Sequence, residues 1–280
     1  MNADDFGLTS GINRAVAELH AAGVLTSCTL MANAAATQEA IEIALRTPSL
    51  GVGCHIVLVD GKPVLPPGRI PSLVDSRTGR FLPTLSMFLV RLMADSIRPS
   101  EVEAEATAQM ERLQASGVTL THFDTHKHTH MFPTILKPLL RAAGARGVCR
   151  VRNPFEPGWS LRATARAPLL RRAQVRLLRR LLPKFHDAVY AEGFKTTNGA
   201  IGVLATGTLN TNAISSLLWK VPEGTYELVT HPGYYDGDLV SAGTRLLESR
   251  EVERSALLAL GRFPVIRLTS FDHLGDPEKA

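Results

Sequence analysis

Residues 23–58, "GVLTSCTLMANAAATQEAIEIALRTPSLGVGCHIVL", contain two short apolar runs on either side of a segment with helical spacing. The runs "GVLTSCTLM" (23–31) and "LGVGCHIVL" (50–58) have the length and β-branched content of buried strands. Between them, "TQEAIEIALRT" (37–47) places apolar residues three and four positions apart, as on one face of a helix. The segment therefore predicts a strand, a helix and a second strand.

The same alternation continues along the chain. Further strands are predicted at 117–123, 147–152, 225–231 and 263–268, and further helices at 12–23, 100–117 and 133–147. Alternation of this kind indicates a parallel α/β sheet, either closed as a barrel or open and doubly wound. In both cases, functional residues lie at the carboxyl ends of the strands. At 280 residues, the chain is expected to form one domain.

The composition is that of an ordinary globular protein, with 45% hydrophobic and 20% charged residues. The three cysteines, Cys28, Cys54 and Cys149, are an odd number without CxxC spacing, which argues against a disulfide framework and a cysteine zinc site. We expect them to be reduced core thiols. No apolar run approaches the length of a membrane span, and no signal sequence is recognised at the N-terminus. A cytoplasmic location is therefore expected.

Four of the nine histidines lie within "THFDTHKHTH", residues 121–130. An extended chain would place every second side chain on one face, namely His122, Asp124, His126, His128 and His130. If the segment becomes helical after the strand, His126 and His130 would instead meet one turn apart. The alternative is a solvated loop with incidental histidines.

Three other motifs carry residues of the same chemical types. "NADDFG" (2–7) contains Asp4 and Asp5, and "GCHIVL" (53–58) places His55 in an apolar run. Alone, an Asp pair is more often a cap or a turn, and a buried histidine is more often part of the core. Together they match a hydrolytic metal site with one carboxylate and two imidazoles, in which the second carboxylate accepts a proton. "VTHPG" (229–233) adds His231 at another strand end, where it could protonate a leaving group.

These four motifs, in this order and near these spacings, resemble those of the YdjC-like carbohydrate deacetylases. The resemblance extends from Asn2 to about Phe271. It implies a single catalytic domain over residues 1–280, folded as a distorted TIM-like barrel, that removes acetyl from an N-acetylated sugar with the help of a metal. The stretch "VLVDGKPVLPPGRIPSLVD" (57–75) is similar to the branch associated with hopanoid biosynthesis, which implies an N-acetylglucosaminyl hopanoid as substrate. Chito-oligosaccharides are the alternative substrate.

The resemblance also implies roles for individual residues. One divalent metal ion would be bound by Asp5, His55 and His126, with Asp4 as general base. By analogy with the broader polysaccharide deacetylases, His231 would be the general acid. Family descriptions often name magnesium, but imidazole ligands favour zinc or another transition metal. Further residues are expected to support the ligands or to contact substrate: Asp124, His128, His130 and Arg152, the last of which could also be a surface arginine.

Members of this family usually begin with a few apolar residues before "NADDFG", whereas only Met1 precedes the motif here. The strand that carries Asp4 and Asp5 is therefore expected to be nearly absent. We expect a chain extended upstream to be more stable, or to bind metal more tightly, than the chain as given.

The net charge of +5 is concentrated between Pro157 and His186, where eight Lys and Arg residues occur without any Asp or Glu. Within it, "RAPLLRRAQVRLLRRLLPKFH" (166–186) has the pattern of a basic amphipathic helix, which could lie on the inner face of an anionic membrane near a lipid-linked sugar. The alternative is a barrel helix with its apolar stripe in the core. Nucleic-acid binding is not favoured because residues 161–184 contain no aromatic side chain. A homodimer is compatible with the sequence.

Two other functions remain open. A metal-dependent phosphoesterase would use additional ligands, for which His128 and His130 are available. A sugar-binding protein without catalysis would need only one of the two adjacent aspartates. The Pro-rich stretch at 61–81 is predicted to be a long irregular excursion, of the kind that forms lids or binding loops.

Overall fold

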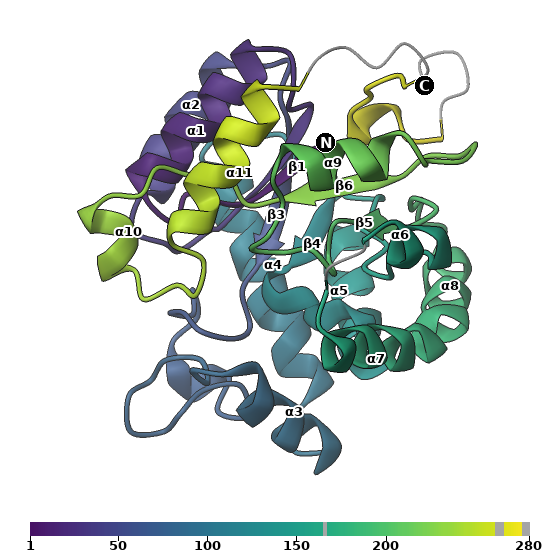
Figure 1. Cartoon of the computed structure of the whole chain (residues 1–280). Coiled ribbons are helices and arrows are strands. Elements are labelled where there is room, and N and C mark those ends of the chain that lie inside the picture. Colours follow the sequence, from purple (N-terminus) through teal and green to yellow (C-terminus); the bar gives the residue numbers. More distant parts are fainter. Residues whose placement is uncertain (165–166, 261–265, 276–280) are drawn as a thin grey trace.

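A computed structural model of the chain describes residues 1–164, 167–260 and 266–275. Its sheet has the strand order β4-β3-β2-β1-β6-β5, and all of these strands pair in parallel (Figure 1). The strands are β1 (Asn2–Phe6), β2 (Ser27–Leu30), β3 (Gly51–Ile56), β4 (Phe123–Thr125), β5 (Ala200–Ile201) and β6 (Glu227–Thr230). The predicted α/β class is thereby confirmed.

The sheet curls toward closure. Beyond β4, isolated parallel bridges join Phe123 to Val151 and Arg150 to Lys195. These bridges carry the pairing from the β4 edge toward the segment that leads into β5. The result is the predicted distorted, TIM-like barrel, in which the segment at 147–152 contributes two bridged residues rather than a full strand.

Four helices form where the apolar spacing predicts them. They are α1 (Ser10–Ala21), α2 (Thr37–Arg46), α4 (Pro99–Ala115) and α5 (Pro133–Ala145). In α1, the Thr9 side chain caps the first turn by accepting a hydrogen bond from the amide of Ile12, and Ile12, Val16 and Leu19 are buried. Figure 1 shows α1 and α2 beside a later helix, α11 (Glu248–Leu258), which contacts α1. This packing brings the C-terminal part of the chain back against β1.

The remaining helices are short. They are α3 (Leu85–Met93), α6 (Gly158–Ala163), α7 (Leu169–Leu178), α8 (Leu182–Ala191), α9 (Thr211–Leu218) and α10 (Gly237–Ser241), with 3-10 turns η1 (Pro67–Arg69), η2 (His126–Met131), η3 (Arg179–Leu181) and η4 (Phe271–His273). Among the described residues, no helix has the length and apolarity needed to cross a membrane.

The first strand corrects one expectation. β1 is present over Asn2–Phe6 and lies between β2 and β6, so the prediction that it is nearly absent was wrong. Pairing on both sides supplies the backbone hydrogen bonds of a central strand, and these do not require a long apolar run.

Other expectations need smaller corrections. The strand predicted at 117–123 forms only from Phe123 onward. Of the strand predicted at 263–268, residues 263–265 lie outside the described residues and 266–268 are not in a strand. Cys28 and Cys54 are buried free thiols as expected, but Cys149 is exposed, so its assignment to the core was wrong.

The long excursion after β3 is irregular, as predicted, and is attached to α4. Buried Glu105 accepts hydrogen bonds from the amides of Val64 and Leu65 at 2.8 and 3.0 Å, and Glu101 accepts one from Ser72 at 2.7 Å. The excursion therefore rests on a helix of the barrel. Its role as a lid stays a prediction.

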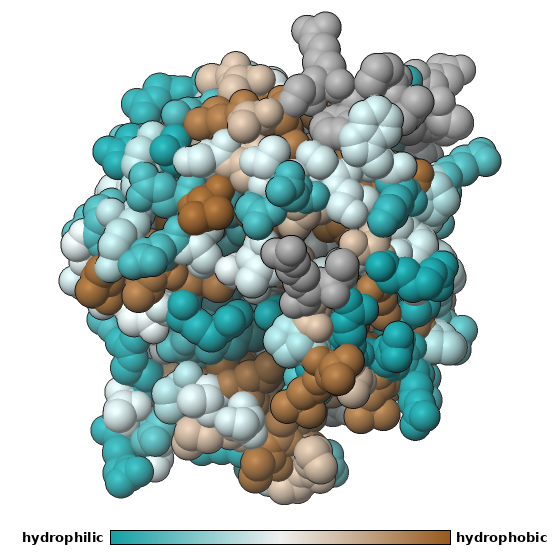
Figure 2. Space-filling view, viewed as in Figure 1, coloured by the Kyte–Doolittle hydropathy of each residue, from teal (hydrophilic) through white to brown (hydrophobic). Residues whose placement is uncertain are grey.

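The basic segment does not form one helix with a buried stripe. It divides into α7, η3 and α8, and Arg166 lies outside the described residues. Leu170 and Leu177 are 72% and 58% exposed, so the alternative that places this stripe in the core is wrong for both. Figure 2 shows hydrophobic side chains gathered over the lower part of the molecule, where α7 and α3 lie in Figure 1. The exposed large hydrophobic side chains of α3 are Met87, Val90 and Met93.

Candidate active site

Two adjacent aspartates point into one site because β1 is irregular at its carboxyl end. In a regular strand, neighbouring side chains point to opposite faces. Here the pairing register with β2 shifts between Ala3 and Phe6, and Asp5 has a φ of 65°, in the left-handed region. This conformation costs on the order of 1 kcal/mol for a residue other than glycine. It directs Asp5 into the same site as Asp4, whereas regular pleating would send the two side chains to opposite faces of the sheet.

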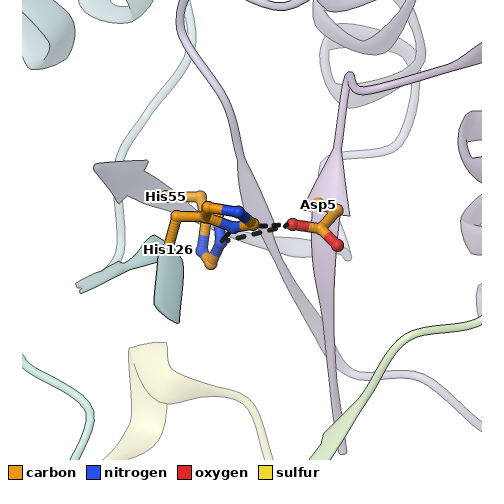
Figure 3. Close-up of side chains that lie close together, drawn as sticks. All are labelled: Asp5, His55 and His126. Carbon is orange, nitrogen blue, oxygen red and sulfur yellow. Dashed lines mark hydrogen bonds and ion pairs between the residues drawn. The ribbon is translucent and has the colours of Figure 1, made fainter. Parts of the chain in front are cut away.

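Asp5, His55 and His126 converge from three strand ends (Figure 3). Asp5 Oδ1 lies 3.5 Å from His55 Nε2 and 3.2 Å from His126 Nδ1, and the two ring nitrogens are 3.3 Å apart. A tetrahedral ion with bonds of about 2.0–2.2 Å separates its ligand atoms by about 3.3–3.6 Å. The three atoms thus form one face of a tetrahedron of the right size for a small divalent ion.

A carboxylate behind His55 determines which ring nitrogen faces this triangle. His55 Nδ1 lies 2.7 Å from Asp124 Oδ1, so the proton on Nδ1 leaves Nε2 free to bind a cation. Burial lowers the pKa of His55, but the Asp124 carboxylate outweighs it and raises the pKa to about 10. Without a metal the ring is therefore protonated on both nitrogens, and a bound cation would displace the proton on Nε2 while Nδ1 keeps its proton toward Asp124.

Arg152 holds the other aspartate. It is fully buried, and its guanidinium donates to both oxygens of Asp4 at 2.8 and 2.6 Å. The same group donates twice to Glu227 Oε1, at 2.9 and 2.6 Å, and forms an ion pair with Asp124. Burial raises the pKa of Asp4, but Arg152 outweighs it and holds the pKa far below the usual range. Asp4 is therefore ionised, and the alternative that Arg152 is a surface residue is wrong.

Negative charge exceeds positive charge in this buried cluster. With the His55 ring neutral, as a bound cation requires, it contains four carboxylates and two guanidinium groups, a difference of two: Asp4, Asp5, Asp124 and Glu227 against Arg152 and Arg250. Without a cation, the proton that His55 holds offsets one of these charges. Burial raises the pKa of Glu227, and if this group is protonated the excess falls to one. Because unpaired buried charge is costly, a divalent cation at the triangle would stabilise the cluster. The donor set and its charge both fit a metal.

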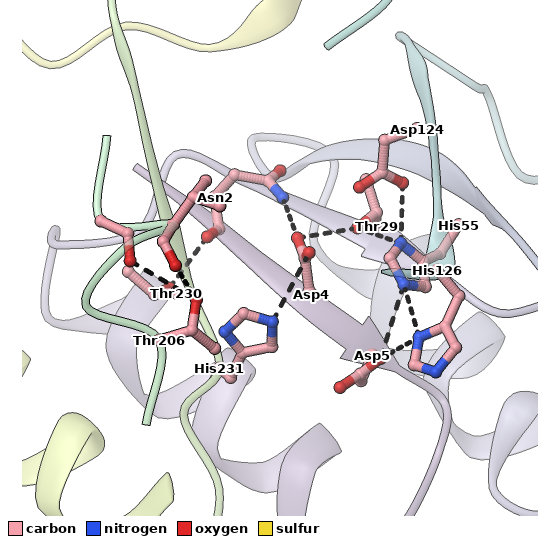
Figure 4. Close-up of polar contacts among 12 residues, drawn as sticks. Asn2, Asp4, Asp5, Thr29, His55, Asp124, His126, Thr206, Thr230 and His231 are labelled. Atoms are coloured by element: carbon pink, nitrogen blue, oxygen red, sulfur yellow. Dashed lines mark hydrogen bonds and ion pairs between the residues drawn. The ribbon is translucent and has the colours of Figure 1, made fainter. Parts of the chain in front are cut away.

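His231 follows β6 and faces Asp4 (Figure 4). Its Nε2 lies 3.8 Å from Asp4 Oδ2, while Asn2 and Thr29 donate to Asp4 Oδ1 at 3.0 and 3.3 Å. Burial lowers the pKa of His231 to about 4, although Asp4 and Asp5 act to raise it. The ring is therefore neutral at neutral pH.

The site is accessible from one side. The side chains of His126 and His231 are 19% and 12% exposed, whereas those of Asp4, Asp5 and His55 are at most 4% exposed. The site therefore reaches solvent at these two histidines.

The histidine-rich segment adopts neither arrangement expected for it. The extended chain ends at Thr125, and η2 follows with positive φ angles of 59° at Lys127 and 53° at His128. These two residues turn the chain, so alternation and helical spacing both fail after His126. His130 instead accepts a hydrogen bond from the Thr125 hydroxyl at 2.7 Å and donates to the carbonyl of Arg152 at 3.1 Å. It lies behind the site and supports Arg152.

Two other members of that segment lie apart from the triangle. His122 stacks on Phe271 with ring centroids 3.8 Å apart and contacts the Thr121 hydroxyl. His128 has a buried Nδ1 with no hydrogen-bond partner among the described residues. Its contact with substrate stays a prediction.

Five residues that contact the site residues were not predicted from the sequence. They are Asn2, Thr29, Glu227, Arg250 and Glu253. Glu227 could have been noticed as a carboxylate inside the apolar run 225–231. Arg250 and Glu253 lie in "ESREVERS", which has the composition of a solvated helix and offers no such indication.

Comparison with known proteins places these observations in a family. A family profile described as YdjC-like protein matches residues 1–260. A protein named carbohydrate deacetylase from Thermoanaerobacter pseudethanolicus is 30% identical over 257 residues, which cover 92% of this chain and 89% of that protein. A chitooligosaccharide deacetylase from Salmonella typhimurium is 36% identical over 150 residues, 53% of this chain and 56% of the relative. The crystal structure of a proposed cellobiose-phosphate cleavage protein from Enterococcus faecalis superimposes with a TM-score of 0.72 at 26% identity, covering 92% of this chain and 89% of that one.

Proposed function

Since this chain belongs to the YdjC-like family, we propose that it is a metal-dependent hydrolase that removes the acetyl group from an N-acetylated sugar. The observation that carries the proposal is the triangle of Asp5, His55 and His126 beside an ionised Asp4. The relatives named as carbohydrate and chitooligosaccharide deacetylases support the same reaction. In this proposal, residues 1–280 act as one catalytic unit.

The proposed cofactor is one divalent ion, and zinc fits better than magnesium. Two of the three donor atoms are imidazole nitrogens, which suit zinc and its neighbours, whereas magnesium prefers oxygen ligands in octahedral geometry. When bound, such an ion lowers the pKa of a water molecule and polarises a carbonyl oxygen.

The chain's own residues supply the proton transfers. Asp4, held ionised by Arg152, takes a proton from the attacking water. His231 is neutral and lies 3.8 Å from Asp4 Oδ2, so it can receive that proton and give it to the departing sugar nitrogen. Amine departure requires this proton, because an unprotonated amide nitrogen is a poor leaving group. Each proton taken from water thus returns to the product.

The substrate proposed for this site is an N-acetylglucosaminyl hopanoid, with chito-oligosaccharides as the alternative. The exposed apolar side chains of α7 support a lipid-linked substrate, as do the arginines beside them. We place peripheral contact with anionic membrane at residues 166–186, of which Arg166 lies outside the described residues. The cytoplasmic location and the homodimer stay predictions.

A metal-dependent phosphoesterase is the second candidate, because Asp4, His55 and Asp124 also cluster with metal-ligand spacing. The name of the Enterococcus faecalis protein also includes a phosphorylated sugar. However, Arg152 already binds Asp4 and Asp124 in this second cluster, and its charge opposes a second cation there. This arrangement favours one metal and the deacetylase.

The test is acetate release from N-acetylglucosaminyl hopanoid and from N,N′-diacetylchitobiose by metal-stripped protein restored with zinc, cobalt or magnesium. Acetate from the hopanoid alone supports the reaction and the lipid-linked substrate together. Acetate from the chitobiose alone supports the reaction and excludes the lipid-linked substrate. No acetate from either substrate, with two metals bound per chain, would overturn the deacetylase in favour of the phosphoesterase.

A further inference from the structure

Helix α11 presents an arginine and a glutamate to the interior of the protein. Arg250 and Glu253, three residues apart on one face, are both buried, whereas Val252 on the same helix is half exposed. Burying a charge is unfavourable unless the group is paired or hydrogen-bonded. The partners of these two side chains therefore indicate what the helix does.

Arg250 contacts the aspartate of the metal triangle. Its guanidinium lies 2.5 Å from Asp5 Oδ2, and its Nε donates to the carbonyl of Leu246 at 3.1 Å. The other oxygen, Asp5 Oδ1, faces His55 and His126. The two oxygens of one carboxylate thus have separate partners, one an arginine and the other the triangle.

This contact also bears on the irregular backbone of β1. Asp5 has a φ of 65°, and such a conformation persists only where the surroundings hold it. The ion pair with Arg250, which lies outside the strand, restrains Asp5 in this conformation. Without it, the carboxylate could rotate or offer both oxygens to a cation.

Glu253 contacts the loop that carries His231. Its Oε1 accepts a hydrogen bond from the backbone amide of His231 at 2.8 Å. Two residues later, the amide of Gly233 donates to the carbonyl of Arg250 at 3.2 Å, and a Cβ at Gly233 would lie 3.2 Å from the Arg250 side chain. The loop after β6 therefore rests directly on α11.

We propose that Arg250 is a positioning residue that makes Asp5 offer a single oxygen to the metal, and that Glu253 positions His231 from the same helix. This inference rests on the proposed function and adds two residues to it. Helix α11 would then hold the metal ligand and the proton-carrying imidazole in a fixed relation. Neither residue touches the reacting atoms.

The direction in which metal affinity changes when Arg250 is replaced distinguishes a positioning role from a purely electrostatic one. A guanidinium that acted only as a positive charge would repel the cation, so its removal would tighten metal binding. A guanidinium that orients the ligand strengthens binding, and loss of such a supporting contact typically weakens metal affinity 10- to 100-fold. The two roles predict opposite changes.

The experiment is titration of the metal-stripped full-length chain with Co²⁺, followed by its visible absorption. We expect Arg250→Met to raise the Kd for Co²⁺ about 10- to 100-fold and to change the absorption of the bound ion. The matched control is Arg254→Met on the same helix, which removes an arginine that pairs with Glu18 and stacks on Tyr234. Its Co²⁺ affinity should stay within about threefold of the unmodified chain.

A second variant covers the case in which Arg250→Met does not fold, as judged by circular dichroism. Arg250→Lys keeps the buried charge but loses the planar fork. Weaker Co²⁺ binding by the folded variant supports the proposal, and equal or tighter binding overturns it. If the unmodified chain binds neither Co²⁺ nor Zn²⁺, the proposed function itself fails, and this inference fails with it.

Replacement of Glu253 is expected to change kcat and not metal affinity. Glu253→Met should lower kcat for acetate release about 10- to 100-fold while Co²⁺ affinity is unchanged, because it displaces His231 but not Asp5. Glu253→Gln keeps an oxygen that can accept from the His231 amide and should restore most of kcat. A kcat that is unchanged in Glu253→Met, or that Glu253→Gln does not restore, would overturn this part of the proposal.

Discussion

Arginine has opposite uses in two regions of this molecule. At the site, Arg152 and Arg250 are buried and each binds carboxylates directly. On α7, Arg176 is exposed, and Arg171 donates to the backbone carbonyls of Val203 and Thr206. The buried arginines contact acidic groups, whereas these two arginines of α7 are exposed or bound to backbone carbonyls. The comparison shows that a local excess of arginine in the sequence does not indicate where arginine matters for chemistry.

The largest effect is expected at the carboxylate that Arg152 holds. Asp4→Asn should lower kcat for acetate release about 100- to 10,000-fold, because the amide cannot accept the proton of water. Its affinity for Co²⁺ should remain within about threefold, since Asp4 is not in the triangle. Asp5→Asn is the contrasting variant and should lose Co²⁺ binding as well. Full activity in Asp4→Asn would remove the general-base role.

Removal of the buried arginine should cost far more stability than removal of an exposed one. Arg152→Met leaves Asp4, Asp124 and Glu227 without their shared cation, and breaking a buried ion pair costs about 3–5 kcal/mol. Arg176→Met on α7 should change the free energy of unfolding by less than about 0.5 kcal/mol. Urea unfolding of both variants measures the difference. Similar changes in the free energy of unfolding of the two variants would contradict the contrast between buried and exposed arginines.

Below pH 6.5, acid should weaken the contribution of the buried histidines to the stability of the metal-stripped protein, whereas buried Glu253, whose pKa burial raises to about 8, acts in the opposite direction. Burial lowers the pKa of His122 and His130 well below the usual value, and that of His231 to about 4. The unfolded chain takes up protons at these positions near pH 6.5 while the folded chain does not, so stability is present above that pH and lost below it. Each group contributes up to about 1.4 kcal/mol per pH unit.

The measurement for this prediction is the free energy of unfolding between pH 7 and pH 5. His130→Gln removes one of these groups, so its free energy of unfolding should rise relative to that of the unmodified chain as the pH falls from 7 to 5. The outcome that contradicts the prediction is a difference in the free energy of unfolding between the two chains that stays constant, or changes in the opposite direction, as the pH falls across this range.

The smallest effect is expected at the membrane. Arg176→Ser should weaken co-sedimentation with phosphatidylglycerol vesicles about fivefold, because each basic residue near an anionic surface contributes about 1 kcal/mol. Arg46→Ser on α2 is the control, since α2 lies away from α7 in Figure 1. Equal binding to phosphatidylcholine vesicles would show that the arginines play no part.

Local patterns in the sequence were sufficient for much of this protein. Apolar periodicity predicted α1, α2, α4 and α5, because each helix buries one face and the spacing records which face, and continuous apolar runs predicted β2 and β3, which are buried throughout. The motifs also identified the residues that converge, which lie toward the carboxyl ends of strands or just after them: Asp4, Asp5, His55, His126 and His231. Parallel strands bring such ends to one edge of the sheet.

Only the tertiary structure determined which groups surround those residues. The left-handed conformation of Asp5, and of Lys127 and His128, depends on contacts distant in sequence, so spacing alone predicted the wrong geometry after His126. The partners Glu227 and Arg250 are 75 and 245 residues from Arg152 and Asp5, a separation that no local pattern encodes. Residue type and periodicity are local properties that one segment can carry by itself. The pairing of buried charges is satisfied only when distant segments pack together, and the fold alone determines which ones do.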